Sequence, residues 1–95
     1  MFYRDGTTEL RLGDRMLFKR FLRRPIPGIV CYIPGLCKPH PEMSIEGLQY
    51  WAFRLGDGTV VSFPFLSGQK VGNTISFLKR GDVGDALLCA DAPLT

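Results

Sequence analysis

The fold is decided by a stretch in the second half of the chain, residues 49–65, QYWAFRLGDGTVVSFPF. Apolar residues alternate with other residues on both sides of Gly56-Asp57-Gly58. Asp-Gly between two alternating runs is a strong hairpin signal, because both residues tolerate the positive φ that a type I′ turn requires. We therefore expect a tight β-hairpin here, with Gly58 in the left-handed region and Trp51 anchored in the core.

Two further runs have the composition of strands and are bounded by Gly, Pro or Asn: residues 28–33, GIVCYI, and residues 74–79, TISFLK. Both are rich in β-branched and aromatic residues, which fit a pleated surface. Eleven Gly and seven Pro in 95 residues predict many turns and short elements. The chain is thus expected to be all-β.

The stretch 14–24 allows two interpretations. As a helix it would place four large apolar side chains on one side and five basic side chains on the other. As a strand it alternates only over residues 15–19. The turn-forming Gly13-Asp14 before it and Pro27-Gly28 after it favour a strand over residues 15–20 that leads into a basic loop.

The segment Gly13-Asp14-Arg15-Met16, followed by a loop and by Pro27-Gly28 with an apolar strand, resembles the opening of small Src-homology-3-like barrels of the KOW and CAP-Gly kinds. The hairpin at residues 49–65 and a short last strand complete the five-strand plan of such barrels. The resemblance covers roughly residues 12–80 and implies an all-β, five-stranded Src-homology-3-like barrel. It concerns the fold and implies no activity.

A single domain is expected over residues 1–95, because a chain of this length supports one modest core. The barrel core would occupy about residues 12–80. A long proline-rich loop is expected over residues 34–47, and a short C-terminal tail over residues 81–95.

The formal net charge is +3, and basic residues concentrate in the first third of the chain. A basic segment raises the local potential and attracts phosphate, and an exposed aromatic side chain beside it can stack on a base. Nucleic-acid binding is therefore one candidate function. Its expected contacts are Arg15, Lys19, Arg20, Arg23 and Arg24.

Aromatic and aliphatic side chains exceed what a small barrel can bury inside. Four of them lie at strand ends or on the opposite parity from the presumed core positions, and are candidate protein contacts: Tyr32, Tyr50, Phe65 and Leu78. Contiguous apolar surface commonly marks a protein interface. We therefore expect a non-catalytic module that binds a protein, including a second copy of itself, with nucleic-acid binding as the alternative.

No enzyme, cofactor or metal site is expected. The potential zinc ligands Cys31, Cys37, His40 and Cys89 lack the Cys-x2-Cys spacing of structural zinc sites. A thiol enzyme built on Cys37 and His40 would need an oxyanion device that the sequence does not indicate. With no leader peptide and no apolar run long enough to span a bilayer, a cytoplasmic location and no membrane partner are expected.

Overall fold

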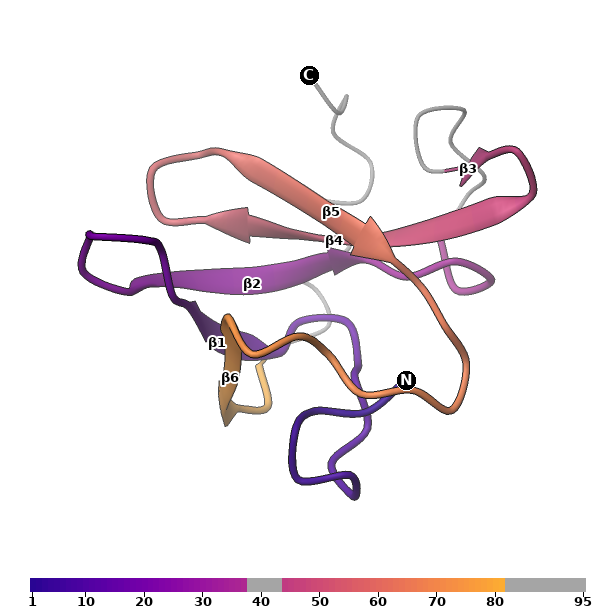
Figure 1. The fold of residues 1–95 in the computed structure, drawn as a ribbon, viewed down its shortest axis with the longest axis horizontal. Helices are drawn as coiled ribbons and strands as arrows, with labels where there is room; N and C mark the ends of the chain where they lie inside the picture. The colour runs from indigo at the N-terminus through magenta and orange to yellow at the C-terminus, as the bar shows by residue number, and fades with distance from the viewer. Residues whose placement is uncertain (38–43, 82–95) are drawn as a thin grey trace.

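A computed structural model describes residues 1–37 and 44–81 of the chain. In this part the regular elements are all strands (Figure 1). They are β1 (Arg15–Phe18), β2 (Ile26–Tyr32), β3 (Ser44–Ile45), β4 (Leu48–Leu55), β5 (Val60–Pro64) and β6 (Ile75–Lys79). The all-β prediction is confirmed.

Every strand pairing is antiparallel. Strands β1, β2, β4 and β5 pair in succession, and β6 returns to pair with β1. The remaining strand, β3, is only two residues long and pairs with the start of β4. It lies in the segment that was expected to be only a loop, where Glu46 and Gly47 both adopt positive φ, 51° and 83°, as a type I′ turn requires.

The hairpin between β4 and β5 is confirmed, but its turn is of a different type. Gly58 has a φ of 91°, as expected, whereas Asp57 does not have positive φ. The Gly58 N–H donates to the Leu55 carbonyl at 2.9 Å, and the Leu55 N–H donates to the Thr59 carbonyl at 2.8 Å. These bonds enclose a three-residue loop with glycine in the left-handed position, so the type I′ prediction was wrong.

The basic stretch after Gly13 forms a strand, β1, over residues 15–18 and not a helix, and the strand ends two residues before the expected end at residue 20. Pairing with β2 on one side and β6 on the other supplies its backbone hydrogen bonds, which outweighs the helical periodicity of its side chains. The Phe18 ring at the end of β1 packs against the rings of Phe53 and Phe63, with centroids 5.2 Å and 6.3 Å away.

The core lies on one face of the sheet. Trp51 is fully buried there, as predicted, and packs tilted against Phe53 with ring centroids 5.3 Å apart. Met16 and Val30 contribute from β1 and β2.

The N-terminal segment also contributes to the core, although the expected barrel began only near residue 12. Tyr3 and Leu10 are both buried in it. The backbone of Phe2 forms isolated β-bridges with Lys70 and with Glu9. These pairings fix the N-terminal segment against the connection between β5 and β6.

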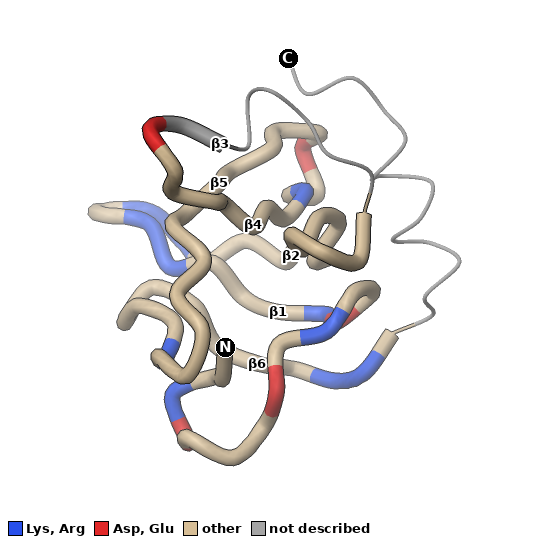
Figure 2. The backbone as a smooth tube through the Cα atoms, turned by 90° about the vertical axis from the view of Figure 1, so that its right-hand side faces the viewer, with Lys and Arg blue, Asp and Glu red and all other residues tan. Residues whose placement is uncertain are grey.

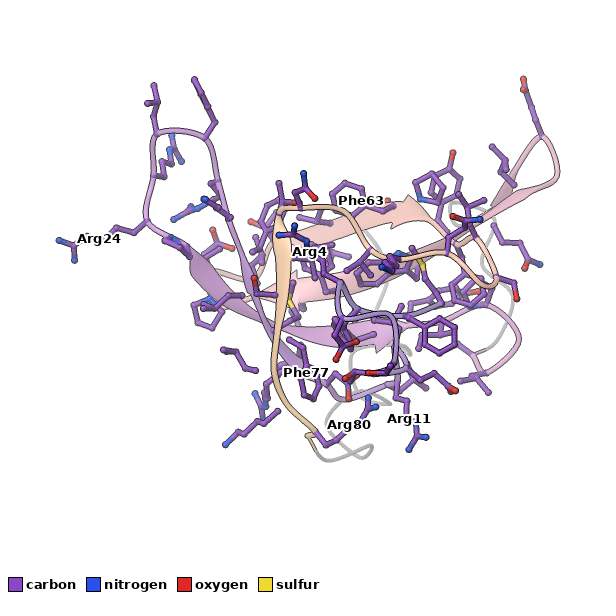
Figure 3. All side chains as sticks on the ribbon, turned by 60° about the horizontal axis from the view of Figure 1, so that its bottom comes forward. Arg4, Arg11, Arg24, Phe63, Phe77 and Arg80 are labelled. Carbon is purple, nitrogen blue, oxygen red and sulfur yellow. The ribbon has the colours of Figure 1, made fainter. Side chains whose placement is uncertain are left out.

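Basic residues occur at several places along the described backbone, and two of these places bear on the surfaces discussed below. Figure 2 shows Lys and Arg in the loop between β1 and β2 and again near the end of β6. Arg24, in that loop, points away from the sheet, whereas Arg80 lies beside the N-terminal segment (Figure 3). Among the described residues there is no helix of the length and hydropathy needed to cross a membrane. The expected C-terminal tail lies outside the described residues apart from Gly81.

Candidate functional site

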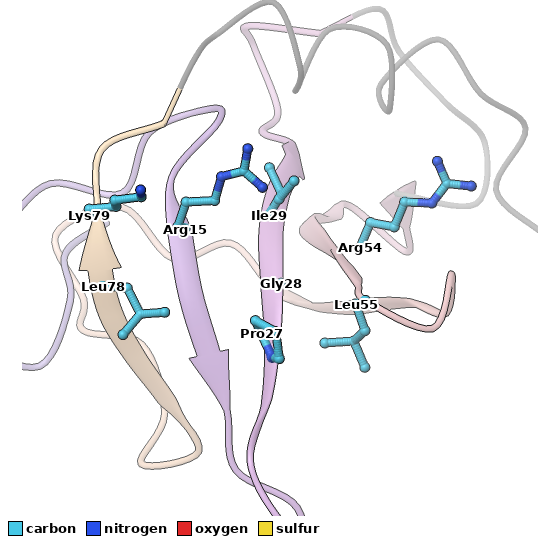
Figure 4. Close-up of a pocket in the computed structure, with 9 residues that line it drawn as sticks. Arg15, Pro27, Gly28, Ile29, Arg54, Leu55, Leu78 and Lys79 are labelled. Atoms are coloured by element: carbon cyan, nitrogen blue, oxygen red, sulfur yellow. The ribbon is translucent and has the colours of Figure 1, made fainter.

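A groove of about 480 Å³ lies on the outer face of the sheet, where β6, β1, β2 and β4 lie side by side (Figure 4). We call it the outer groove. It is lined by Arg15, Pro27, Gly28, Ile29, Arg54, Leu55, Gly56, Leu78 and Lys79.

Strand register explains why cations meet at this groove. Arg15 is paired with Lys79 on β6 and with Ile29 on β2, and Ile29 is paired with Arg54 on β4. These four residues therefore form one row across four strands, with three cations among them. Because neighbouring strands lie about 4.8 Å apart, the row extends over roughly 15 Å.

Aliphatic groups form the rest of the groove. Pro27, Leu55 and Leu78 lie below the cationic row in Figure 4. No carboxylate is among the described lining residues. The groove therefore combines apolar surface with a positive rim, a combination suited to a ligand with aliphatic and anionic groups.

The four predicted protein contacts do not form one exposed patch. Tyr32 is only 5% exposed and lies in a small cluster with Cys31 and Ala52, against which Tyr50 packs. Phe65 is half-buried against the main core. Leu78 alone among the four is exposed, at 49%, and it lines the outer groove. Strand alternation did not predict the burial of Tyr32, because the register of β2 against β4 shifts between Val30 and Tyr32.

The five predicted nucleic-acid contacts are divided between two places. Arg15 lies in the outer groove, at the start of β1. Lys19, Arg20, Arg23 and Arg24 lie in the loop after β1, residues 19–25, which we call the basic loop. The Arg20 guanidinium donates from Nε and Nη2 to the Arg24 carbonyl, at 3.3 Å and 3.0 Å, so this side chain braces the loop.

The basic loop also carries two exposed apolar side chains. Phe21 is 89% exposed and Leu22 is 87% exposed, the highest values among the large apolar residues described. Sequence reasoning placed Leu22 on the apolar side of a helix or in a loop, and gave no reason to expect both residues at the tip.

A buried polar cluster joins the N-terminal segment to the end of β6. Asp14 Oδ2 accepts hydrogen bonds from the Tyr3 hydroxyl at 2.7 Å, the Arg11 N–H at 3.0 Å and Arg80 Nη1 at 2.6 Å. Burial, and then the hydrogen bond to Asp14, raise the pKa of Tyr3 above its ordinary value. The cluster fixes three segments relative to one another, and no sequence pattern indicated it, because Tyr3 and Arg80 lie 11 and 66 positions from Asp14.

The cysteine chemistry considered from sequence lies only partly within the described residues. The Cys37 thiol is half-buried and accepts a hydrogen bond from the Ile33 N–H at 3.5 Å. No three metal-ligating side chains converge in the described part of the chain. His40 and Cys89 lie outside it.

A scan against protein-family models found no match, and searches of curated proteins and of solved structures also found none.

Proposed function

We propose that this protein is a non-catalytic binding module that holds an acidic, aliphatic segment of another protein in the outer groove. The observation that carries the proposal is the pair of exposed cations Arg54 and Lys79, which lie with Arg15 in one cross-strand row beside the exposed Pro27 and Leu78. An aliphatic side chain of the partner would lie against the exposed Pro27 and Leu78. Carboxylates beside it would meet the cations of the rim.

The chemistry of the rim favours carboxylates of a peptide over nucleic-acid bases. Guanidinium groups pair with carboxylates through two parallel hydrogen bonds, which adds geometric specificity to the attraction. Bases would need aromatic side chains on which to stack, and none lines the groove among the described residues.

Charge also bears on the expected self-association. Two copies that met groove to groove would bring like charges together, which disfavours that dimer. The outer groove therefore does not face the same groove of a second copy, and self-association through other surfaces stays a prediction that the oligomeric state in solution tests.

A small Src-homology-3-like barrel remains our proposal for the fold family. Two features support it: the opening Gly13-Asp14 before β1, and the pairing of the last strand, β6, with the first. The four strands β1, β2, β4 and β5 that pair in succession agree with the same plan.

The test uses two fluorescein-labelled peptides, Glu-Leu-Glu-Ile-Glu and Gln-Leu-Gln-Ile-Gln, titrated with the protein in an anisotropy assay. The acidic peptide is expected to bind, and its affinity should fall as salt is added because the rim is exposed. The double variant R54S/K79S should bind it at least about tenfold more weakly, a loss of about 1.4 kcal/mol.

A matched control removes the same charge elsewhere. Arg4 and Lys70 are exposed and do not line the groove, so R4S/K70S should bind within about twofold of the parent. Equal affinity for the two peptides, or an equal loss in the two double variants, would contradict the proposal.

A further inference from the structure

The basic loop presents a second surface, separate from the outer groove. It connects β1 to β2 and extends beyond the strands (Figure 1). Its two large apolar residues, the adjacent Phe21 and Leu22, are almost fully exposed. Exposed aliphatic and aromatic side chains side by side at a protruding turn contribute nothing to the core, so a partner that buried them would gain their hydrophobic free energy.

The loop holds these side chains outward by its own structure. Leu22 has a φ of 57°, a left-handed conformation that is uncommon for a residue with a side chain. The Arg20 guanidinium is bonded to the Arg24 carbonyl, and the Arg23 N–H donates to the Arg20 carbonyl at 3.4 Å. The tip is thus preformed, which lowers the entropy lost on binding.

Cations surround the apolar tip. Lys19, Arg23 and Arg24 are exposed, and within the described residues no carboxylate lies at ion-pair distance from them. The pKa of Asp57, in the turn between β4 and β5, is lowered chiefly by hydrogen bonds from Thr59 and also by the charge of Arg20 in the basic loop. The order from the end of the loop inward is therefore apolar first and cationic behind.

We propose that the basic loop is a membrane-surface anchor that inserts Phe21 and Leu22 into a bilayer containing anionic lipids. The order of groups in the loop matches the order in a bilayer surface, where hydrocarbon lies beneath a layer of phosphate. A nucleic acid fits less well, because Phe21 can stack on a base but Leu22 cannot. From the sequence, no membrane partner was expected, because no apolar run is long enough to span a bilayer. A contact at the membrane surface does not require a spanning segment, so the proposal departs from that expectation.

The direct test is flotation with vesicles of phosphatidylcholine, with and without phosphatidylserine as a minor component. The parent should float with the anionic vesicles and not with the neutral ones. F21S/L22S should weaken partitioning more than about tenfold, because apolar burial is lost. R23S/R24S should weaken it about tenfold to thirtyfold, from the loss of two cations near the anionic surface.

Two controls match these variants. L36S/L66S removes two other exposed leucines, and R4S/K70S removes two other exposed cations. Both should float as the parent does. If either control loses as much binding as the loop variants, the loop is not the anchor.

Depth of insertion gives an independent measurement. In the variant F21W, vesicles with brominated acyl chains should quench the new tryptophan, whereas Trp51, fully buried, should stay unquenched in the parent. Absence of quenching would overturn the proposal. The proposal would also be overturned if the parent did not float with anionic vesicles but bound a single-stranded oligonucleotide tightly and the loop variants abolished that binding.

Discussion

The two ends of strand β1 reverse the usual distribution of polar and apolar groups. Immediately before the strand, the carboxylate of Asp14 is buried, with 1% of the residue exposed. Just after it, Phe21 and Leu22 are almost fully exposed. A buried charge and an exposed pair of large apolar side chains each cost free energy unless something compensates them.

The compensation differs between the two ends, and the difference separates structure from function. At the Asp14 end, the hydrogen-bond donors Tyr3, Arg11 and Arg80 all belong to the same chain, so the Asp14 carboxylate stabilises the fold. At the tip of the basic loop, no compensation comes from the described residues. The compensation expected there comes from a partner, which is why we assign a contact role to the loop and a structural role to Asp14.

The largest expected effect tests the structural end. Asp14→Ala should destabilise the protein by about 3 kcal/mol, because the Tyr3 hydroxyl and the Arg11 N–H lose their acceptor while buried or partly buried. Chemical denaturation followed by circular dichroism measures this loss.

Asp14→Asn provides the matched comparison. It keeps an acceptor for Tyr3 but removes the charge that attracts Arg80, and it places an amide where Asp14 Oδ1 has no partner among the described residues. Its cost should therefore lie between those of the parent and Asp14→Ala. If Asp14→Ala were no more destabilising than Arg4→Ala on the surface, the structural role would be wrong.

A smaller effect concerns Tyr3 and its pH dependence. Tyr3→Phe should cost about 1–2 kcal/mol near neutral pH, from one buried hydrogen bond. The pKa of Tyr3 is raised in the folded protein, so the folded state keeps a proton that the unfolded state loses near pH 10. The stabilisation is therefore complete below about pH 10 and is lost as the pH rises further.

Denaturation curves at pH 8 and above pH 10 measure this dependence. The parent should lose more stability between these conditions than Tyr3→Phe does. The same loss in both proteins would show that Tyr3 does not couple ionisation to folding.

Local patterns in the sequence were sufficient for most of the sheet. Alternation over residues 49–65 and the Asp-Gly turn predicted the β4–β5 hairpin, the burial of Trp51 and the left-handed Gly58, because each depends on neighbours along the chain. The turn type failed because it depends on a loop length that Asp-Gly alone does not determine.

The candidate site was harder to predict, since it depends on register between distant strands. Arg54 lies on the opposite parity from Phe53 and Leu55, which indicates an outward position. Its place in a row with Arg15 and Lys79 required the pairing of four strands. The hydrogen bond between Tyr3 and Asp14 likewise joins residues eleven positions apart and leaves no periodic pattern.

The smallest expected effect sharpens the comparison at the exposed end. Leu22→Asn should stabilise the protein by about 0.5–1 kcal/mol, because asparagine adopts the left-handed conformation at lower cost than leucine. The same variant should bind anionic vesicles more weakly than the parent, since it replaces an apolar tip residue. Denaturation and flotation of one protein sample measure both changes.

Leu22→Ala separates the two causes. It removes apolar surface but keeps a side chain at a φ of 57°, so it should weaken vesicle binding without a gain in stability. If Leu22→Ala stabilised the protein as much as Leu22→Asn, relief of backbone strain would not be the reason. If Leu22→Asn bound vesicles as well as the parent, the strained conformation would serve no membrane contact, and the two ends of β1 would not differ in the way we infer.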